Sequence, residues 1–256
     1  MKNNIKHIIL WSGTLVIALV LFGFASSSHK SAVCWKMDIE VEHLSGLYFI
    51  DNTSIEERIL DLGDPIVGSK LEAIRVDKIR QRLIDLPSVK SAEVYHTVDG
   101  ILKVNVTQRT PLFRVINAEG ESYYVDTDGG RMPLSQHYTA RVPVLTGNIT
   151  TPYAEAASST EEVTLLAEAY ELIQFIENDG LWSAQTEHIV VDSNNEFELI
   201  PRVGSARILI GKPTELPEKF KRLKAFYLEM AHNNNINKYK RINVKYRDQV
   251  VCERYF

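Results

Sequence analysis

Cysteine is scarce in this sequence, with only Cys34 and Cys252 among its 256 residues. So low a count excludes a small secreted fold held together by several disulfides. It leaves two states open, a pair of free thiols or one bridge between the two positions. We expect free thiols, because nothing in the sequence brings the two positions together.

An excess of positive charge is also missing. The 33 aspartates and glutamates outnumber the 29 lysines and arginines, which gives a net charge of −4. Proteins that bind nucleic acids gather basic residues on one face, so the charge balance gives no support for such a partner. We expect no nucleic-acid partner.

Common catalytic and metal-binding motifs are absent as well. The sequence has no phosphate-binding glycine loop, no His-Glu-x-x-His helix, no Cys-x-x-Cys pair and no Gly-x-Ser-x-Gly turn. Residues 126–130 resemble the start of a calcium loop but lack its later acidic ligands, which favours a β-turn. We therefore expect no catalytic residue, cofactor, metal or small-molecule substrate. An enzyme whose site is assembled from distant residues stays open as an alternative.

One long uncharged run is present, at residues 8–25. At about 1.5 Å per residue, a helix of this length nearly matches a bilayer core of about 30 Å. Lys2 and Lys6 precede the run and acidic residues follow it, so residues 1–7 are expected in the cytoplasm. We predict a transmembrane helix at 8–25, a juxtamembrane linker at 26–36 and a chain that continues outside the membrane.

A cleaved signal peptide is the alternative to this anchor. Gly23 and Ala25 supply small residues of the kind that a signal peptidase prefers. The apolar run is longer than the core of most signal peptides, and this length favours a retained anchor.

The pattern after the linker predicts a compact domain of order β-α-α-β-β. Apolar and acidic residues alternate from Met37, and two helical stretches follow, the second at about 76–86. Two alternating strands then flank the turn signal Asp99-Gly100. The two helices can cover one face of a three-stranded sheet.

The remaining sequence predicts a larger, strand-rich domain. Short strand patterns are interrupted by two helical patterns, one at 161–178 and one starting at Pro217. Near the end of the chain, Ile242, Val244 and Tyr246 alternate with charged or polar residues, which predicts a closing strand with a basic outer face. Charges on such a strand either block unwanted pairing or dock a partner, and both interpretations stay open.

The order helix, Leu-Pro-x-Val, strand, turn, strand and Arg-x-Pro outside a single anchor resembles the FtsQ/DivIB family of cell-division proteins. The residues that carry the resemblance are Leu86, Pro87, Val89, Ala92, Val94, Leu102, Val104, Val106, Arg109 and Pro111. The stretches YYVDTDGGRMPLS and KYKRINVKYRDQVV add a turn and a terminal strand typical of the family. Gln108, Asn243 and Lys245 depart from the family pattern, which weakens the transfer of a partner site.

The resemblance implies an α+β protein with a POTRA domain at 37–111 and an FtsQ-type β domain at 112–256. It implies a non-enzymatic division scaffold, single-pass in the inner membrane, with its outer domains in the periplasm. Its partners would be divisome proteins, among them FtsB-like and FtsL-like single-pass coiled-coil proteins that bind by strand addition at the C-terminal edge.

The motif match places Tyr246 on the docking strand, and position and charge add Lys245 and Arg247 as candidate partner-binding residues. A basic edge would suit an acidic partner segment. The competing interpretation makes Tyr246 a core residue of its strand. For the whole protein, the rival function is an envelope POTRA-type chaperone or assembly factor for outer-membrane or secreted proteins.

Overall fold

The structure is a computed structural model that describes residues 15, 17, 32–42, 46–135, 138–154, 159–232 and 236–255. These residues form two compact units. Unit 1 contains residues 32–42 and 48–108, and unit 2 contains residues 46–47 and 109–255. The predicted transmembrane helix at 8–25 lies outside the described residues apart from Leu15 and Ile17, which are helical with exposed side chains. Within the described part of the chain, no helix has both the length and the apolar character needed to cross a membrane.

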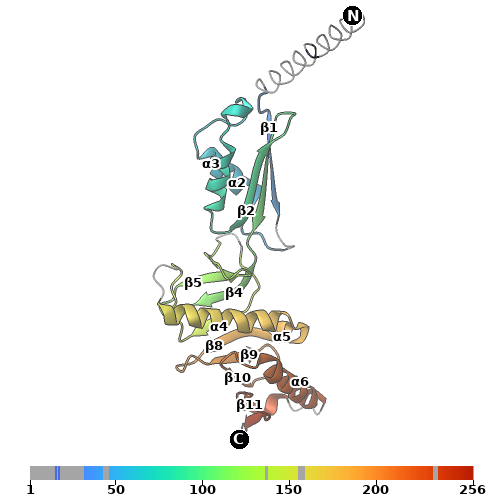
Figure 1. The fold of residues 1–256 in the computed structure, drawn as a ribbon. Helices are drawn as coiled ribbons and strands as arrows, with labels where there is room; N and C mark the ends of the chain where they lie inside the picture. The colour runs from blue at the N-terminus through green and yellow to red at the C-terminus, as the bar shows by residue number, and fades with distance from the viewer. Residues whose placement is uncertain are drawn as a thin grey trace, which may run out of the picture. The chain divides into compact units, whose positions relative to one another are not determined.

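Unit 1 has the predicted order of elements (Figure 1). These are β1 (Lys36–Glu42), α2 (Asn52–Leu60), η1 (Leu71–Ala73), α3 (Val76–Ile84), β2 (Val89–His96) and β3 (Ile101–Gln108). The sheet has the order β1-β3-β2, in which β1 runs parallel to β3 and β2 runs antiparallel to it. The β-α-α-β-β prediction is confirmed.

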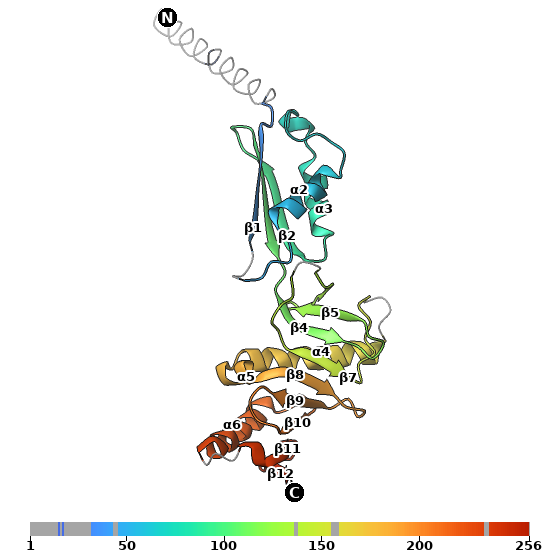
Figure 2. The ribbon, with the colours of Figure 1, turned by 180° about the vertical axis from the view of Figure 1, so that it is seen from behind.

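The two helices of unit 1 cover one face of this sheet (Figure 2). Ile55 and Ile59 of α2 and Ile79 and Leu83 of α3 are buried in one core with the inward residues of the sheet, Leu102, Val104 and Val106 of β3 among them. On β3, alternate residues are buried, as the apolar alternation in the sequence predicts for a half-buried strand.

The first described residues of unit 1 correct the predicted linker. We predicted linker through residue 36, but Cys34 is fully buried and its backbone N–H donates to Ser69 O at 2.8 Å. Leu71 N donates in turn to Ala32 O at 3.0 Å. Residues 32–36 therefore belong to the fold, because backbone hydrogen bonds attach them to the loop before η1.

Unit 2 is built on a mixed nine-stranded sheet. Its strands are β4 (Pro111–Ile116), β5 (Ser122–Asp126), β6 (Arg131–Met132), β7 (Val144–Gly147), β8 (Thr186–Val191), β9 (Phe197–Pro201), β10 (Arg207–Gly211), β11 (Tyr239–Asn243) and β12 (Val251–Arg254). The sheet order is β12-β11-β10-β9-β8-β7-β4-β5-β6. The pairs β4–β7, β7–β8 and β10–β11 are parallel, so the predicted mainly antiparallel domain contains more parallel pairing than the sequence indicated.

The helices of unit 2 are α4 (Thr160–Glu177), α5 (Gly180–Gln185) and α6 (Leu216–His232), with a short η3 (Ile236–Lys238) before β11. The two predicted helices are α4 and α6, and α5 was not predicted. A capping box begins α4, because the Ser159 hydroxyl accepts from Glu162 N while the Glu162 carboxylate accepts from Ser159 N. The helices lie on one face of the sheet (Figure 2).

One registered row of side chains forms the centre of the unit 2 core. Strand pairing places its members side by side across seven strands: Val115, Leu145, Ile189, Leu199, Ile208, Ile242 and Cys252. All except Cys252 are at most 1% exposed, and Cys252 packs against the same core from the edge. Cys34 and Cys252, both in the described part of the chain, are free thiols. Since neighbouring residues in a strand alternate between faces, the residues beside this row face away from the helices.

Candidate partner-binding edge

Strand β12 forms one end of the nine-stranded sheet. It pairs antiparallel with β11, with Arg241 opposite Glu253 and Ile242 opposite Cys252. In the described part of the chain, no strand pairs with its other side. The outward N–H and C=O groups of β12 are therefore available to a further extended segment.

The position of this edge corrects the predicted closing strand. We expected one strand to run through Tyr246, but β11 ends at Asn243 and a turn separates it from β12. Asp248 in the turn has a positive φ of 60°, which an extended strand does not allow. The three predicted partner-binding residues therefore lie in the connection before the edge strand, outside any strand.

Contacts with two other parts of unit 2 hold this connection in place. The Arg222 guanidinium of α6 donates to Val244 O at 3.1 Å and to Tyr246 O at 3.2 Å. The fully buried Val244 side chain packs into the core. Asn243 accepts from Lys245 N at 3.0 Å through its side-chain oxygen. The turn is thus fixed against α6 and presents its outer side chains in a defined arrangement.

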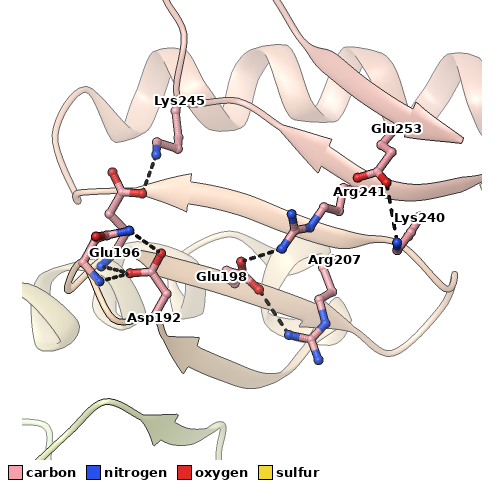
Figure 3. A network of polar contacts seen from close by, with 9 residues as sticks. Asp192, Glu196, Glu198, Arg207, Lys240, Arg241, Lys245 and Glu253 are labelled. Atoms are coloured by element: carbon pink, nitrogen blue, oxygen red, sulfur yellow. Dashed lines mark hydrogen bonds and ion pairs between the residues drawn. The ribbon is translucent and has the colours of Figure 1, made fainter.

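Lys245 and Arg247 both have acidic partners within unit 2. The Lys245 ammonium donates to the Glu196 carboxylate, in the turn that precedes β9 (Figure 3). Arg247 donates to Glu215 at 2.7 Å. This hydrogen bond and charge raise the pKa of Arg247 and lower the pKa of Glu215. The basic face that we expected to attract an acidic segment is thus partly neutralised by the protein itself.

Tyr246 differs from both neighbours because its side chain is 50% exposed. The competing interpretation of Tyr246 as a core residue is therefore wrong. Its backbone carbonyl is held by Arg222, while half of the residue is exposed to solvent in the connection between β11 and β12.

A row of charges crosses the sheet face that is opposite to the helices (Figure 3). Glu198 on β9 is only 8% exposed and accepts from Arg207 on β10 at 3.3 Å. Arg241 on β11 approaches the same carboxylate at 3.8 Å. On the edge strand, Glu253 lies opposite Arg241 and 3.5 Å from the Lys240 ammonium. Acidic and basic residues thus alternate in groups toward the open edge, and the outermost is the Glu253 carboxylate.

Strand β6, at the opposite end of the sheet, differs from β12 in its length and burial. Strand β6 has two residues, of which Met132 is fully buried. The preceding turn is held by Asp126, whose 1%-exposed carboxylate accepts from Arg109 at 2.8 Å and from Asp128 N and Gly130 N at 2.9 and 2.7 Å. At residues 126–130, where the sequence favoured a β-turn, the structure has a turn that an internal ion pair holds together.

One groove of unit 2 is lined by several carboxylates. This groove, of about 720 Å³, lies between α4 and the segment before α6. Two of its three carboxylates, Glu168 and Glu215, are paired with Lys212 and Arg247, at 2.8 and 2.7 Å, and the third is Glu171. Among the described residues, no group of His, Cys, Asp or Glu side chains is arranged to hold a metal ion. The feature of unit 2 best suited to recognition is accordingly the exposed backbone of β12.

A small β-α-α-β-β unit followed by a large sheet with an open terminal strand defines a class of protein, the POTRA-like unit joined to a β domain. A POTRA-like domain model matches residues 32–107, and a model described as FtsQ/DivIB, C-terminal related, matches residues 110–253. The chain belongs to the FtsQ/DivIB family, whose members are non-enzymatic cell-division proteins. No curated protein matches the chain significantly.

Two departures from the family pattern have structural roles. Gln108 is 4% exposed, and its side-chain oxygen accepts from Phe49 N and Ile50 N at 2.9 and 3.1 Å. An amide oxygen, like a carboxylate oxygen, can accept both hydrogen bonds. The other departure, Asn243, accepts from Lys245 N and helps to end β11.

Proposed function

We propose that this protein is a single-pass, inner-membrane scaffold of the cell-division machinery, anchored by residues 8–25 with its N-terminus in the cytoplasm and both units in the periplasm. Its β12 edge binds an extended segment of an FtsB-like partner, which associates with an FtsL-like protein. Family membership supports a role in cell division through protein–protein contacts. The open β12 edge is the observation that carries the binding mechanism.

Strand addition explains how so short an edge can bind a partner. The added strand forms backbone hydrogen bonds with β12, and these supply affinity whatever the side chains are. Specificity then comes from the side chains that alternate between the two faces of the enlarged sheet.

The register of β12 determines which side chains fit. A partner residue opposite Cys252 would extend the registered apolar row that starts at Val115, so an apolar side chain is favoured there. A partner residue opposite Glu253 would lie on the charged face beside an exposed carboxylate, so a basic side chain is favoured. The partner strand should therefore alternate apolar and polar residues, with at least one cation.

The three residues predicted from the sequence have secondary roles in this proposal. Tyr246 offers a half-exposed ring to a segment that continues past the end of β12. Lys245 and Arg247 shape the turn through Glu196 and Glu215, and a partner's acidic groups would have to compete with these internal carboxylates.

The test is co-purification of the tagged full-length protein from membranes beside a version that stops after Val250. The shorter version lacks β12 but keeps the core residues Ile242 and Val244, so a thermal melt should show that unit 2 remains folded. Mass spectrometry should find small single-pass coiled-coil proteins with the full-length protein only. A folded, truncated protein that still retains these partners contradicts the proposal.

A matched pair of charge reversals tests the edge without changing its length. Glu253→Lys places a cation where we expect the partner's cation, and it should weaken binding. Glu187→Lys is the control, because Glu187 is an exposed carboxylate on the central strand β8, away from the edge. Equal loss of binding in both variants would show that net charge, and not the edge, controls recognition.

A further inference from the structure

Four exposed apolar side chains gather at one end of unit 1. They are Val33, Trp35, Val67 and Val98, which are between 45% and 77% exposed. We call this set the Trp35 tip. None of the four was assigned a role from the sequence.

Backbone hydrogen bonds bring the tip together from three segments. Trp35 N donates to Gly100 O at 3.0 Å, which attaches the start of β1 to the turn between β2 and β3. Gly68 N donates to Cys34 O at 2.7 Å, which attaches the loop that contains Val67. Cys34 is buried between the exposed Val33 and Trp35 and anchors this short segment in the core.

The turn at Gly100 is shaped to carry the tryptophan. A Cβ at Gly100 would lie 2.7 Å from Val33 O and 3.0 Å from the Trp35 ring, and the residue has a φ of +87°, so glycine is required. The indole N–H donates to Asp99 O at 2.7 Å. The ring therefore keeps its only polar atom bonded to the protein while 59% of the side chain stays exposed.

The tip lies at the point where unit 1 joins the N-terminal part of the chain. Seven residue steps separate Ala32 from Ala25, the last residue of the apolar run. Even fully extended, these steps cover at most about 25 Å. If residues 8–25 span the bilayer, the tip is held within about one bilayer-core thickness of the membrane surface.

We propose that the Trp35 tip binds the outer surface of the membrane, with its side chains inserted into the headgroup region of the lipids. The inference rests on the proposed membrane anchor. Tryptophan prefers the membrane–water interface, where its ring is partly apolar and its N–H is satisfied, and the three valines supply adjoining apolar surface.

The charges at the tip limit how deeply it enters. Asp99 is exposed in the same turn, and a hydrogen bond from Thr97 lowers the pKa of its carboxyl, which therefore stays ionised at neutral pH. An ionised carboxylate is costly to place in hydrocarbon, so the headgroup level is the expected depth. The bilayer would thus hold unit 1 at its own surface.

Quenching by brominated lipids tests the proposal on the full-length protein. The chain has three tryptophans, and Trp182 is 1% exposed in the unit 2 core, so it gives a constant background. A Trp11→Phe protein reports on Trp35, and a Trp35→Phe protein reports on Trp11 in the apolar run. Each is reconstituted in phosphatidylethanolamine–phosphatidylglycerol vesicles with bromine either near the glycerol or near the bilayer centre.

We expect Trp35 to lose most of its emission when the bromine is near the glycerol, and little when it is near the centre. If Trp11 is quenched but Trp35 is not, the anchor stands and the tip proposal is overturned. If Trp11 is not quenched either, the proposed anchor fails and the tip proposal fails with it. A blue-shifted Trp35 emission without quenching would indicate a protein contact and would also overturn the proposal.

A pair of substitutions provides the matched control. Val98→Asp adds a charge at the most exposed position of the tip and should reduce the quenching of Trp35. Val203→Asp adds the same charge at an exposed valine of unit 2 and should leave the quenching of Trp35 unchanged. Unchanged quenching in the Val98→Asp protein would contradict insertion of the tip.

Discussion

The two ends of the nine-stranded sheet in unit 2 are built differently. At the β6 end the strand is two residues long, Met132 is fully buried, and Asp126 holds the turn through an internal ion pair. At the β12 end the strand is longer and its side chains are largely exposed. Both end strands, β6 and β12, pair with a described strand on one side only. Proteins usually block exposed edges because they invite pairing. One edge of the sheet is thus a very short strand beside a turn held by an internal ion pair, and the other is a longer, exposed strand.

The largest effect on stability is expected at the β6 end. Asp126→Ala removes a buried carboxylate that accepts from the Arg109 guanidinium, the Asp128 N–H and the Gly130 N–H. The free energy of unfolding of unit 2 should fall by about 3–5 kcal/mol, measured by chemical denaturation. The control is Glu187→Gln, which breaks an exposed pair at 3.8 Å and should cost at most about 0.5 kcal/mol. Similar losses of unfolding free energy in both variants would contradict the expectation that the Asp126 ion pair stabilises unit 2 more than an exposed pair does.

At the open end we expect binding to change more than stability. Tyr246→Ala removes a half-exposed ring and should weaken partner binding about tenfold, which corresponds to about 1.4 kcal/mol. Lys245→Ala should weaken it less, because Lys245 is already paired with Glu196. Titration of each purified variant with the purified partner measures the two dissociation constants. A larger loss of affinity for Lys245→Ala, with folding intact, would show that the partner contacts the Lys245 charge more than the Tyr246 ring.

The charge row between the two ends should have an intermediate role. Glu198→Gln keeps the shape of the side chain but removes the charge shared by Arg207 and Arg241. Both arginines are about half exposed and can be solvated, so the free energy of unfolding should fall by only about 1 kcal/mol. A loss as large as that of Asp126→Ala would show that this row also carries the stability of the sheet.

The smallest effect is a pH dependence of stability caused by His188, which lies on β8, on the sheet face opposite the helices. Burial, and then the charge of Arg207, lower the pKa of His188 below its ordinary value of 6.5. The unfolded chain therefore binds the proton more readily than the folded one, and stability should decrease as the pH falls below about 6.5. His188→Gln should flatten this decrease in denaturation experiments at several pH values.

The Thr146→Val protein provides the control for this pH dependence. It removes the 2.6 Å contact with His188 but keeps the titrating ring, so its stability should still decrease below the same pH. An unchanged slope in the His188→Gln protein would mean that other groups cause the pH dependence.

Local patterns in the sequence predicted most helices and strands but not all of the pairings between strands. The β-α-α-β-β order of unit 1 followed from helical spacing and from alternation around Asp99-Gly100, which are local signals. The parallel pairing of β7 with β4 and β8 joins segments that are distant in sequence, so no local pattern indicates it. The two helices of unit 2 were predicted because each carries a long apolar stripe.

The candidate site was predicted only in its approximate location. The alternation of Ile242, Val244 and Tyr246 suggested one long strand, but Arg222 of α6 holds the carbonyls of Val244 and Tyr246 and so bends the chain. That contact is tertiary and has no local signal. The Trp35 tip was missed for the same reason, because its four side chains come from separate segments that only the folded unit brings together.

The parallel pairing of β10 and β11 also sets an order of assembly. The chain must pass through α6 before β11 can lie beside β10, and β12 can be added only after β11 is in place. Contacts between segments distant in sequence form slowly, because the intervening chain must first be ordered. The strand that we propose for docking therefore depends on β11 for its place at the edge of the sheet. On the proposed mechanism, the partner binds only a molecule in which β11 has placed β12 at this edge, so binding would report that this end of unit 2 is assembled.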